Sequence, residues 1–412
     1  MRFKSKTGSW FVGLILCFVW QGGLFGQEEL GQWRGPNRDG VIPAQLTPQA
    51  WPDNLSREWS IEVGSGYANP LVINGEIFLF ARQAGDEVML AIDPGSGDIN
   101  WKSGYSAPFS MNPSTDPHGP GPKATPAYAD GRLFTLGMSG IVTAFDASDG
   151  TIIWQTPASR VHPLFHTAMS PIVDGDAVIV HVGGHDDGAL TAFDAHSGQI
   201  KWEWAGDGPA YGSPVVFDVE GSRQVITYTQ ENLIGVDVEN GRLLWRRPFV
   251  TEYTTTSQTP IRHKEVFLQA GRGNGITAFR VIREGDAWTT EDVWHTAEAS
   301  LHMTNGVITD SMLVGLSHLN SGQYFGLDLE TGDVLWRGNP RQAENASILS
   351  VGENILSLQD DAVLLIFEVS RAGLVTKHRY DVAESATWTQ PTVSGNRIFI
   401  KDISNLTLWT LD

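Results

Sequence analysis

The sequence is nearly without cysteine, since its 412 residues contain only Cys17. That residue lies in an apolar run at positions 10–20, which follows basic residues at positions 2, 4 and 6. A basic start, a short apolar run and a small residue at Gly26 are typical of a secretory signal peptide. An uncleaved anchor is the alternative, although a membrane-spanning helix needs about 20 apolar residues. We therefore expect residues 1–26 to be removed, which leaves no thiol, disulfide or cysteine-based metal site.

Positive charge is also scarce, because 28 Lys and Arg residues stand against 47 Asp and Glu residues. Removing residues 1–26 takes away three basic residues and no acidic one, so 25 basic residues remain against 47 acidic ones. A surface this acidic repels nucleic acid and anionic lipid headgroups. We expect a periplasmic or secreted protein that binds no nucleic acid and spans no membrane after signal cleavage. Attraction to cations or to a basic partner is the alternative meaning of the charge.

One motif, by contrast, is repeated along the whole chain. In each copy an Asp closes a strand, a Gly follows four residues later and a Trp follows eight residues later. The Asp carboxylate can accept hydrogen bonds from the N–H groups of a turn, and the Gly can adopt the positive φ of a tight reversal. The complete copies are Asp93 with Trp101, Asp146 with Trp154, Asp194 with Trp202, Asp237 with Trp245, and Asp328 with Trp336.

The repeat predicts eight units over residues 55–412. Two units have degenerate motifs, at 278–280 and 366–368, and the last motif is cut where the chain ends. The strand missing from the last unit is supplied by residues at about 55–63, and joining the two ends closes a ring. We therefore predict an all-β fold, an eight-bladed β-propeller of four-stranded antiparallel blades.

The repeated Trp is predicted to be structural. Propeller blades pack face to face, and a large flat residue on each outer strand fills the wedge between neighbours. A Trp can bury about 150–250 Å² and still donate its N–H to a backbone carbonyl. Residues 27–54 have few strand signals and many turn formers. We expect them to form an irregular arm over the folded body, with Trp33 and Trp51 as apolar anchors.

The Ala-x-Asp-x-x-x-Gly-x-x-x-Trp motif resembles the tryptophan-docking repeat of the propellers typified by pyrroloquinoline quinone (PQQ) enzymes. That superfamily includes PQQ-dependent alcohol dehydrogenases and the non-catalytic BamB subunit of the outer-membrane protein assembly machinery. The dehydrogenases are similar in fold but bring a disulfide of adjacent cysteines, a calcium site and an aspartate base. The mature chain has no cysteine, and no motif in it identifies the calcium ligands or the base.

Candidate binding residues lie in loops that such a ring would gather at one mouth of its channel. Histidine with aspartate can hold a metal, and Lys or Arg can hold the carboxylates of an acidic cofactor. No pair has a characteristic ligand spacing, so we predict no catalytic residue and no metal site. The candidates for cofactor or ligand binding are His118, Lys123, His162, His166, His185, Arg272, His302, His318 and Trp388.

A complete structural repeat without a complete catalytic set favours a BamB-like, non-catalytic scaffold. We expect a monomer that binds a protein partner in the cell envelope, or a ligand, and that has no resident cofactor. One alternative is a PQQ-dependent quinoprotein oxidoreductase of the alcohol or sugar dehydrogenase type, which would use PQQ and calcium at the channel mouth. A carbohydrate-binding propeller is the other alternative.

Overall fold

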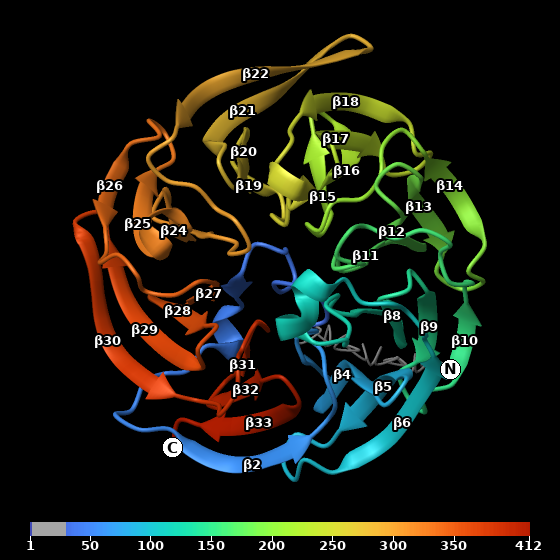
Figure 1. The fold of residues 1–412 in the computed structure, drawn as a ribbon, viewed down its shortest axis with the longest axis vertical. Coiled ribbons are helices and arrows are strands. Elements are labelled where there is room, and N and C mark those ends of the chain that lie inside the picture. The colour runs from blue at the N-terminus through green and yellow to red at the C-terminus, as the bar shows by residue number, and fades with distance from the viewer. Residues whose placement is uncertain (2–29) are drawn as a thin grey trace.

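A computed structural model describes Met1 and residues 30–412. The signal peptide predicted for residues 1–26 therefore falls, Met1 apart, outside the described residues. The described chain forms eight sheets in a ring, each built on four antiparallel strands that run from the channel to the rim (Figure 1). The sheet of blade 7 gains a fifth strand, β1 (Val41–Ile42), which is parallel to its neighbour. This arrangement confirms the predicted eight-bladed β-propeller. No helix in the described chain is long and apolar enough to cross a membrane.

The blades follow one another along the chain, each beginning with its innermost strand. Their strands are β3 (Leu71–Ile73), β4 (Glu76–Gln83), β5 (Asp86–Ile92) and β6 (Ile99–Ser106) in blade 1; β7 (Ala127–Ala129), β8 (Arg132–Leu136), β9 (Val142–Asp146) and β10 (Ile152–Gln155) in blade 2; β11 (Ile172–Asp174), β12 (Ala177–Gly183), β13 (Gly188–Asp194) and β14 (Ile200–Trp204) in blade 3; and β15 (Val215–Val219), β16 (Ser222–Tyr228), β17 (Asn232–Asp237) and β18 (Leu243–Pro248) in blade 4.

The second half of the ring is built in the same way. Its strands are β19 (Ile261–His263), β20 (Val266–Gly271), β21 (Gly275–Glu284) and β22 (Ala287–Thr296) in blade 5; β23 (Val307–Thr309), β24 (Met312–Ser317), β25 (Gln323–Asp328) and β26 (Val334–Arg337) in blade 6; β27 (Ala346–Val351), β28 (Asn354–Gln359), β29 (Val363–Ser370) and β30 (Gly373–Asp381) in blade 7; and β31 (Thr392–Ser394), β32 (Arg397–Lys401) and β33 (Asn405–Thr410) in blade 8. Short 3-10 helices lie in the connections: η1 (Ala44–Leu46), η2 (Pro113–His118), η3 (Glu252–Thr254) and η4 (Leu319–Ser321).

The ring closes between the two ends of the described chain. Strand β2 (Ser56–Glu62) pairs antiparallel with β33 and becomes the outer strand of blade 8. Trp59 of β2 donates its Nε1–H to the carbonyl of Pro94 in blade 1 at 3.3 Å. The prediction that residues near 55–63 complete the last blade is confirmed.

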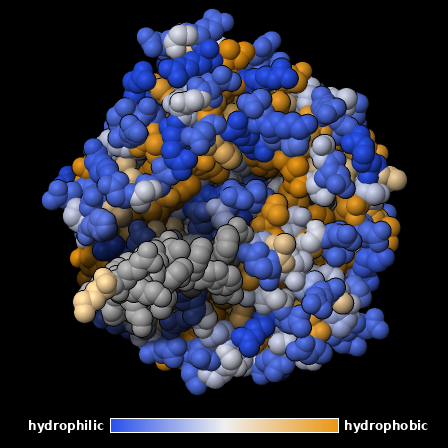
Figure 2. Space-filling view, turned by 180° about the vertical axis from the view of Figure 1, so that it is seen from behind, coloured by the Kyte–Doolittle hydropathy of each residue, from blue (hydrophilic) through white to orange (hydrophobic). Residues whose placement is uncertain are grey.

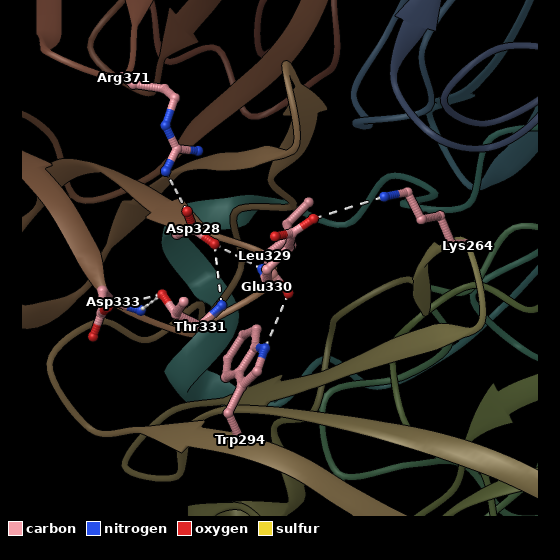
Figure 3. A network of polar contacts seen from close by, with 8 residues as sticks. All are labelled: Lys264, Trp294, Asp328, Leu329, Glu330, Thr331, Asp333 and Arg371. Atoms are coloured by element: carbon pink, nitrogen blue, oxygen red, sulfur yellow. Dashed lines mark hydrogen bonds and ion pairs between the residues drawn. The ribbon is translucent and has the colours of Figure 1, made fainter.

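Figure 3 shows how consecutive blades are joined. Trp294, on the outer strand of blade 5, donates its Nε1–H to the carbonyl of Leu329 in blade 6 at 3.0 Å. Asp328 organises the same turn, because its carboxylate accepts the backbone N–H of Glu330 at 2.7 Å. The carboxylate also pairs with Arg371 of blade 7. One turn therefore links three blades.

The same docking contact recurs around the ring. Trp202 of blade 3 donates to the carbonyl of Val238 in blade 4 at 2.9 Å, and its indole lies against Gly241 of the same turn. Blade 4 is an exception, because the turn of blade 5 has Arg280 in the place of the motif's Asp. Trp245, on the outer strand of blade 4, donates instead to the side chain of Gln224 in the same blade, at 2.7 Å.

Candidate functional site

Residues 30–47, here called the arm, enter the central channel from the face that carries the turns between first and second strands. Leu30 forms a β-bridge with Val72 of blade 1, and β1 (Val41–Ile42) runs parallel to β27 of blade 7. The carbonyl of Leu46 accepts a hydrogen bond from Gly395 in blade 8. Figure 1 shows the arm in blue inside the ring. The structure therefore places residues 30–47 within the channel, whereas the sequence pattern predicts that residues 27–54 lie over the folded body.

Arg38 attaches the arm to blades 3 and 4. Its guanidinium donates to the carbonyl of Pro214 at 2.9 Å, to that of Ser170 at 3.3 Å and to that of Pro171. Its Nε–H donates to the side chain of Gln32 at 2.9 Å. No carboxylate in the described chain forms an ion pair with this buried guanidinium, and burial lowers its pKa to about 9.

Arg34 attaches the arm to the opposite side of the ring. Its guanidinium donates to the carbonyls of Gly306 at 2.7 Å and Ile348 at 3.4 Å, which belong to the first-strand segments of blades 6 and 7. Burial lowers its pKa to about 10. A Cβ on Gly40, whose φ is +79°, would lie 2.5 Å from the guanidinium. The arm's turn therefore requires glycine at this position.

The remaining contacts of the arm reach blades 2 and 5. The carbonyl of Gly31 accepts the backbone N–H of Tyr128 at 2.8 Å, and Trp33 donates its Nε1–H to the hydroxyl of Thr259 at 2.9 Å. With the contacts above, the arm bonds to every blade or to the residue leading into it. The arm thus fills one end of the channel. Figure 2 shows the molecule from behind, a face on which hydrophilic residues predominate.

At the other end a pocket of about 390 Å³ opens between the loops that lead into the first strands. We call this end the mouth. Because Trp33 lines the pocket, the arm supplies part of its inner end. The remaining lining combines aromatic rings with hydroxyl and amide groups. Its aromatic members are Tyr67, Phe165, Tyr211 and Trp388, and its amide and cationic or titratable members are His118, Lys123, His302, Asn305 and Asn345.

One corner of the pocket holds Tyr67 and Lys123 on two backbone segments in close contact. The N–H of Tyr67 donates to the carbonyl of Pro122 at 2.8 Å, and a Cβ on Gly121 would lie 2.2 Å from the backbone of Ser65. Burial lowers the pKa of Lys123 to about 8. Burial, with a smaller effect of the Asp402 charge, raises the pKa of Tyr67 to about 12. Near neutral pH this corner therefore presents an ammonium and a protonated phenol.

The histidines of the pocket are held neutral near pH 7. His118 meets Trp388 edge to face, with ring centroids 4.5 Å apart. Burial and then the charge of Lys123 lower the pKa of His118. The ring centroids of His302 and His318 lie 5.9 Å apart. Burial, followed by the charge of Arg272, lowers the pKa of His302 to about 4.

The structure brings four of the nine predicted site residues into the pocket: His118, Lys123, His302 and Trp388. The other five lie outside its lining, namely His162, His166, His185, Arg272 and His318. His166 is 6% exposed and bonds through Nε2 to the carbonyl of Ser110 at 2.8 Å, so it supports a loop. Nothing in the sequence marks Tyr67 or Tyr211 as lining residues, because a tyrosine in a loop carries no spacing signal.

The pocket does not fit PQQ bound with calcium. PQQ is a flat tricarboxylate, whereas Lys123 is the only cationic lining residue in the described chain at neutral pH. No three His, Cys, Asp or Glu side chains among residues 30–412 lie close enough to share a metal ion.

Comparison with known proteins matches residues 84–338 to the family described as outer membrane protein assembly factor BamB. The BamB of Yersinia pestis is 24% identical over 258 residues, which cover 58% of this chain and 62% of that protein. The alignment thus spans less than two thirds of that relative.

Solved structures agree on the fold. The crystal structure of BamB from Moraxella catarrhalis has a TM-score of 0.61 at 16% identity and covers 86% of this chain and 99% of that chain. The quinohemoprotein alcohol dehydrogenase from Comamonas testosteroni has a TM-score of 0.65 at 13% identity and covers 93% of this chain and 80% of that chain. At these identities the likeness shows the propeller alone. The family match, which covers more than half of the sequence, carries the assignment: the chain belongs to the family of outer membrane protein assembly factor BamB.

Proposed function

We propose that this protein is an extracytoplasmic, non-catalytic scaffold that binds another protein of the cell envelope at the mouth of its propeller. Family membership supports a BamB-type scaffold, and the acidic chain with its basic, apolar N-terminal segment supports a location outside the cytoplasm. The partner itself is part of the proposal. The mouth has one feature that supports the binding of a partner protein.

That feature is a group of exposed apolar side chains on two mouth loops, here called the rim patch. It consists of Val161 and Leu164 between β10 and β11, with Val250 and Tyr253 between β18 and β19. Tyr253 is 68% exposed and Val250 is 59% exposed. Exposed clusters of large apolar residues commonly mark protein interaction sites. Tyr253 and Thr254 both have positive φ, of +56° and +54°, so the loop between β18 and β19 turns sharply here.

His185 holds the two loops of the rim patch together. Its Nε2 accepts the backbone N–H of Leu164 at 3.1 Å and lies 3.1 Å from the hydroxyl of Thr254. Its Nδ1 bonds to the carbonyl of Pro209 at 3.0 Å, which fixes the ring. The patch is therefore preorganised before any partner arrives, and preorganisation lowers the entropic cost of association.

Site-specific photo-crosslinking tests this proposal. We would introduce benzoylphenylalanine in place of Tyr253 and, as the control, in place of Ile200, which is 54% exposed on an outer strand. In cells that express the full chain, Tyr253 should give one discrete adduct with an envelope protein, and Ile200 should not. Adding Leu164→Asp should reduce that adduct. Identical adducts from both positions, or none from Tyr253, would contradict the proposal.

A further inference from the structure

We propose that the mouth pocket binds a small organic molecule with a flat apolar body and a single carboxylate, which pairs with Lys123 and Tyr67. This site is lined by other residues than the four of the rim patch, and it goes beyond the scaffold function. Three features support this ligand: the charge of the pocket, two donors that have no anionic acceptor in the described chain, and the shape of the pocket walls.

Lys123 is a cation that has no counterion among the described residues. Its ammonium has three N–H donors, and its one hydrogen bond in the described chain goes to the carbonyl of Phe165 at 3.3 Å. No carboxylate among residues 30–412 forms an ion pair with it. Burying an ammonium without a partner is costly, and a charge-assisted bond to a carboxylate would offset that cost.

Tyr67 supplies a second donor in the same corner. Its side chain is 7% exposed, and its hydroxyl has no hydrogen-bond partner in the described chain. Buried hydroxyl groups nearly always have a partner, and this one is almost inaccessible to solvent, so a ligand oxygen would reach it after a slight shift of the Tyr67 side chain. The phenol stays protonated at neutral pH, so it acts as a hydrogen-bond donor towards an anion. A carboxylate has two oxygens, which would satisfy Lys123 and Tyr67 together.

The walls fit a flat apolar body. Trp33, Phe165, Tyr211 and Trp388 present aromatic surface, and Met303 adds an adaptable apolar contact. The indole of Trp33 is fixed by its hydrogen bond to Thr259. A volume of about 390 Å³ lies within the range of small-molecule sites. Because the arm fills the other end of the channel, such a ligand would enter from the mouth.

A pair of fluorescent probes tests the charge requirement directly. Anilinonaphthalene sulfonate and N-phenyl-1-naphthylamine share a flat apolar body, and only the first is an anion. We expect the anion to saturate one site on the purified protein with roughly tenfold higher affinity, the effect of one added charge-assisted bond. Lys123→Met should remove that advantage and leave the neutral probe unchanged. Lys264→Met, at an exposed lysine outside the pocket, should change neither probe.

Two further measurements cover the other parts of the proposal. Tyr67→Phe should weaken the anionic probe several-fold while preserving the fold, because it removes only the hydroxyl. Naphthoate should displace the bound probe, and naphthalenemethanol, which lacks the carboxylate, should not. Equal affinity of the two fluorescent probes, or full retention of the anion's advantage in Lys123→Met and Tyr67→Phe, would overturn the proposal. Neither result would bear on the rim patch, whose test uses different residues.

Discussion

Alanine at Gly241 should cost far more stability than alanine at Gly75. Both glycines have a left-handed backbone conformation, with φ of +73° at Gly241 and +79° at Gly75. A side chain in this conformation destabilises the fold by roughly 1–2 kcal/mol. A Cβ at Gly75 would meet no atom within 4 Å, but at Gly241 it would lie 2.6 Å from Cε3 of Trp202. Alanine at Gly75 therefore measures backbone strain alone, and alanine at Gly241 also perturbs the docking contact between blades 3 and 4.

The size of the difference follows from the displacement of the indole. Carbon atoms in contact lie about 3.5–4.0 Å apart, so Trp202 must retreat by about 1 Å. That retreat breaks its 2.9 Å bond to the carbonyl of Val238. A buried carbonyl that loses its donor costs about 1–3 kcal/mol, and overpacking adds about 1–3 kcal/mol. With the smaller unfolded-state entropy of alanine included, we expect losses of about 1 kcal/mol at Gly75 and about 3–5 kcal/mol at Gly241.

Guanidinium unfolding followed by tryptophan fluorescence would measure both losses. The same pair of substitutions in a Trp202→Phe background isolates the contact, because the indole bond is already absent there. The excess cost at Gly241 should then shrink. Losses at Gly241 and Gly75 that agree within about 0.5 kcal/mol, the usual limit of additivity for independent sites, would refute the docking argument.

Two other predictions concern the arm and acid sensitivity. Arg38→Met should release the arm and expose Trp33 to chymotrypsin, whereas Arg246→Met, at an exposed arginine, should leave that cleavage slow. Burial lowers the pKa of His181 from 6.5 to about 4, so the folded state excludes a proton that the unfolded state binds. The free energy of unfolding therefore receives the full benefit of neutral His181 above pH 6.5. It decreases by up to about 3 kcal/mol as pH falls toward 4. His181→Gln should flatten that part of the stability profile, and exposed His295→Gln should not.

The blade count was predictable because the repeated motif is itself the contact between blades. An Asp that caps a turn and a Trp that docks on the next turn must recur once per blade, so their spacing carries the architecture. The arm was not predictable in the same way. Arg34 and Arg38 bond to backbone carbonyls. Because every residue has a backbone carbonyl, the sequence does not indicate which ones accept these hydrogen bonds.

The pocket was predictable only in part, for a geometric reason. Loop positions tell which face a residue lies on, but they do not tell how far its side chain lies from the channel axis. His118 and Lys123 line the pocket from the long loop before blade 2, whereas His166 in the next loop is buried and meets Phe109 edge to face, with ring centroids 4.8 Å apart. Tyr67 enters the corner through a close backbone contact that involves glycine, and sequence spacing does not encode such a contact.

The two proposed sites share a wall, which makes their coupling measurable. The hydroxyl of Tyr211, a pocket residue, accepts the backbone N–H of Phe165 at 3.0 Å and lies 3.4 Å from Nε2 of His185, the residue that holds the rim patch. A ligand that shifts Tyr211 must therefore shift the groups that position Leu164. If both sites are used, thermodynamic linkage requires that the partner change probe affinity by the same factor as the probe changes partner affinity. Probe titrations with and without the crosslinked partner would measure that factor, and His185→Gln should reduce it because the shared hydrogen bonds would be altered.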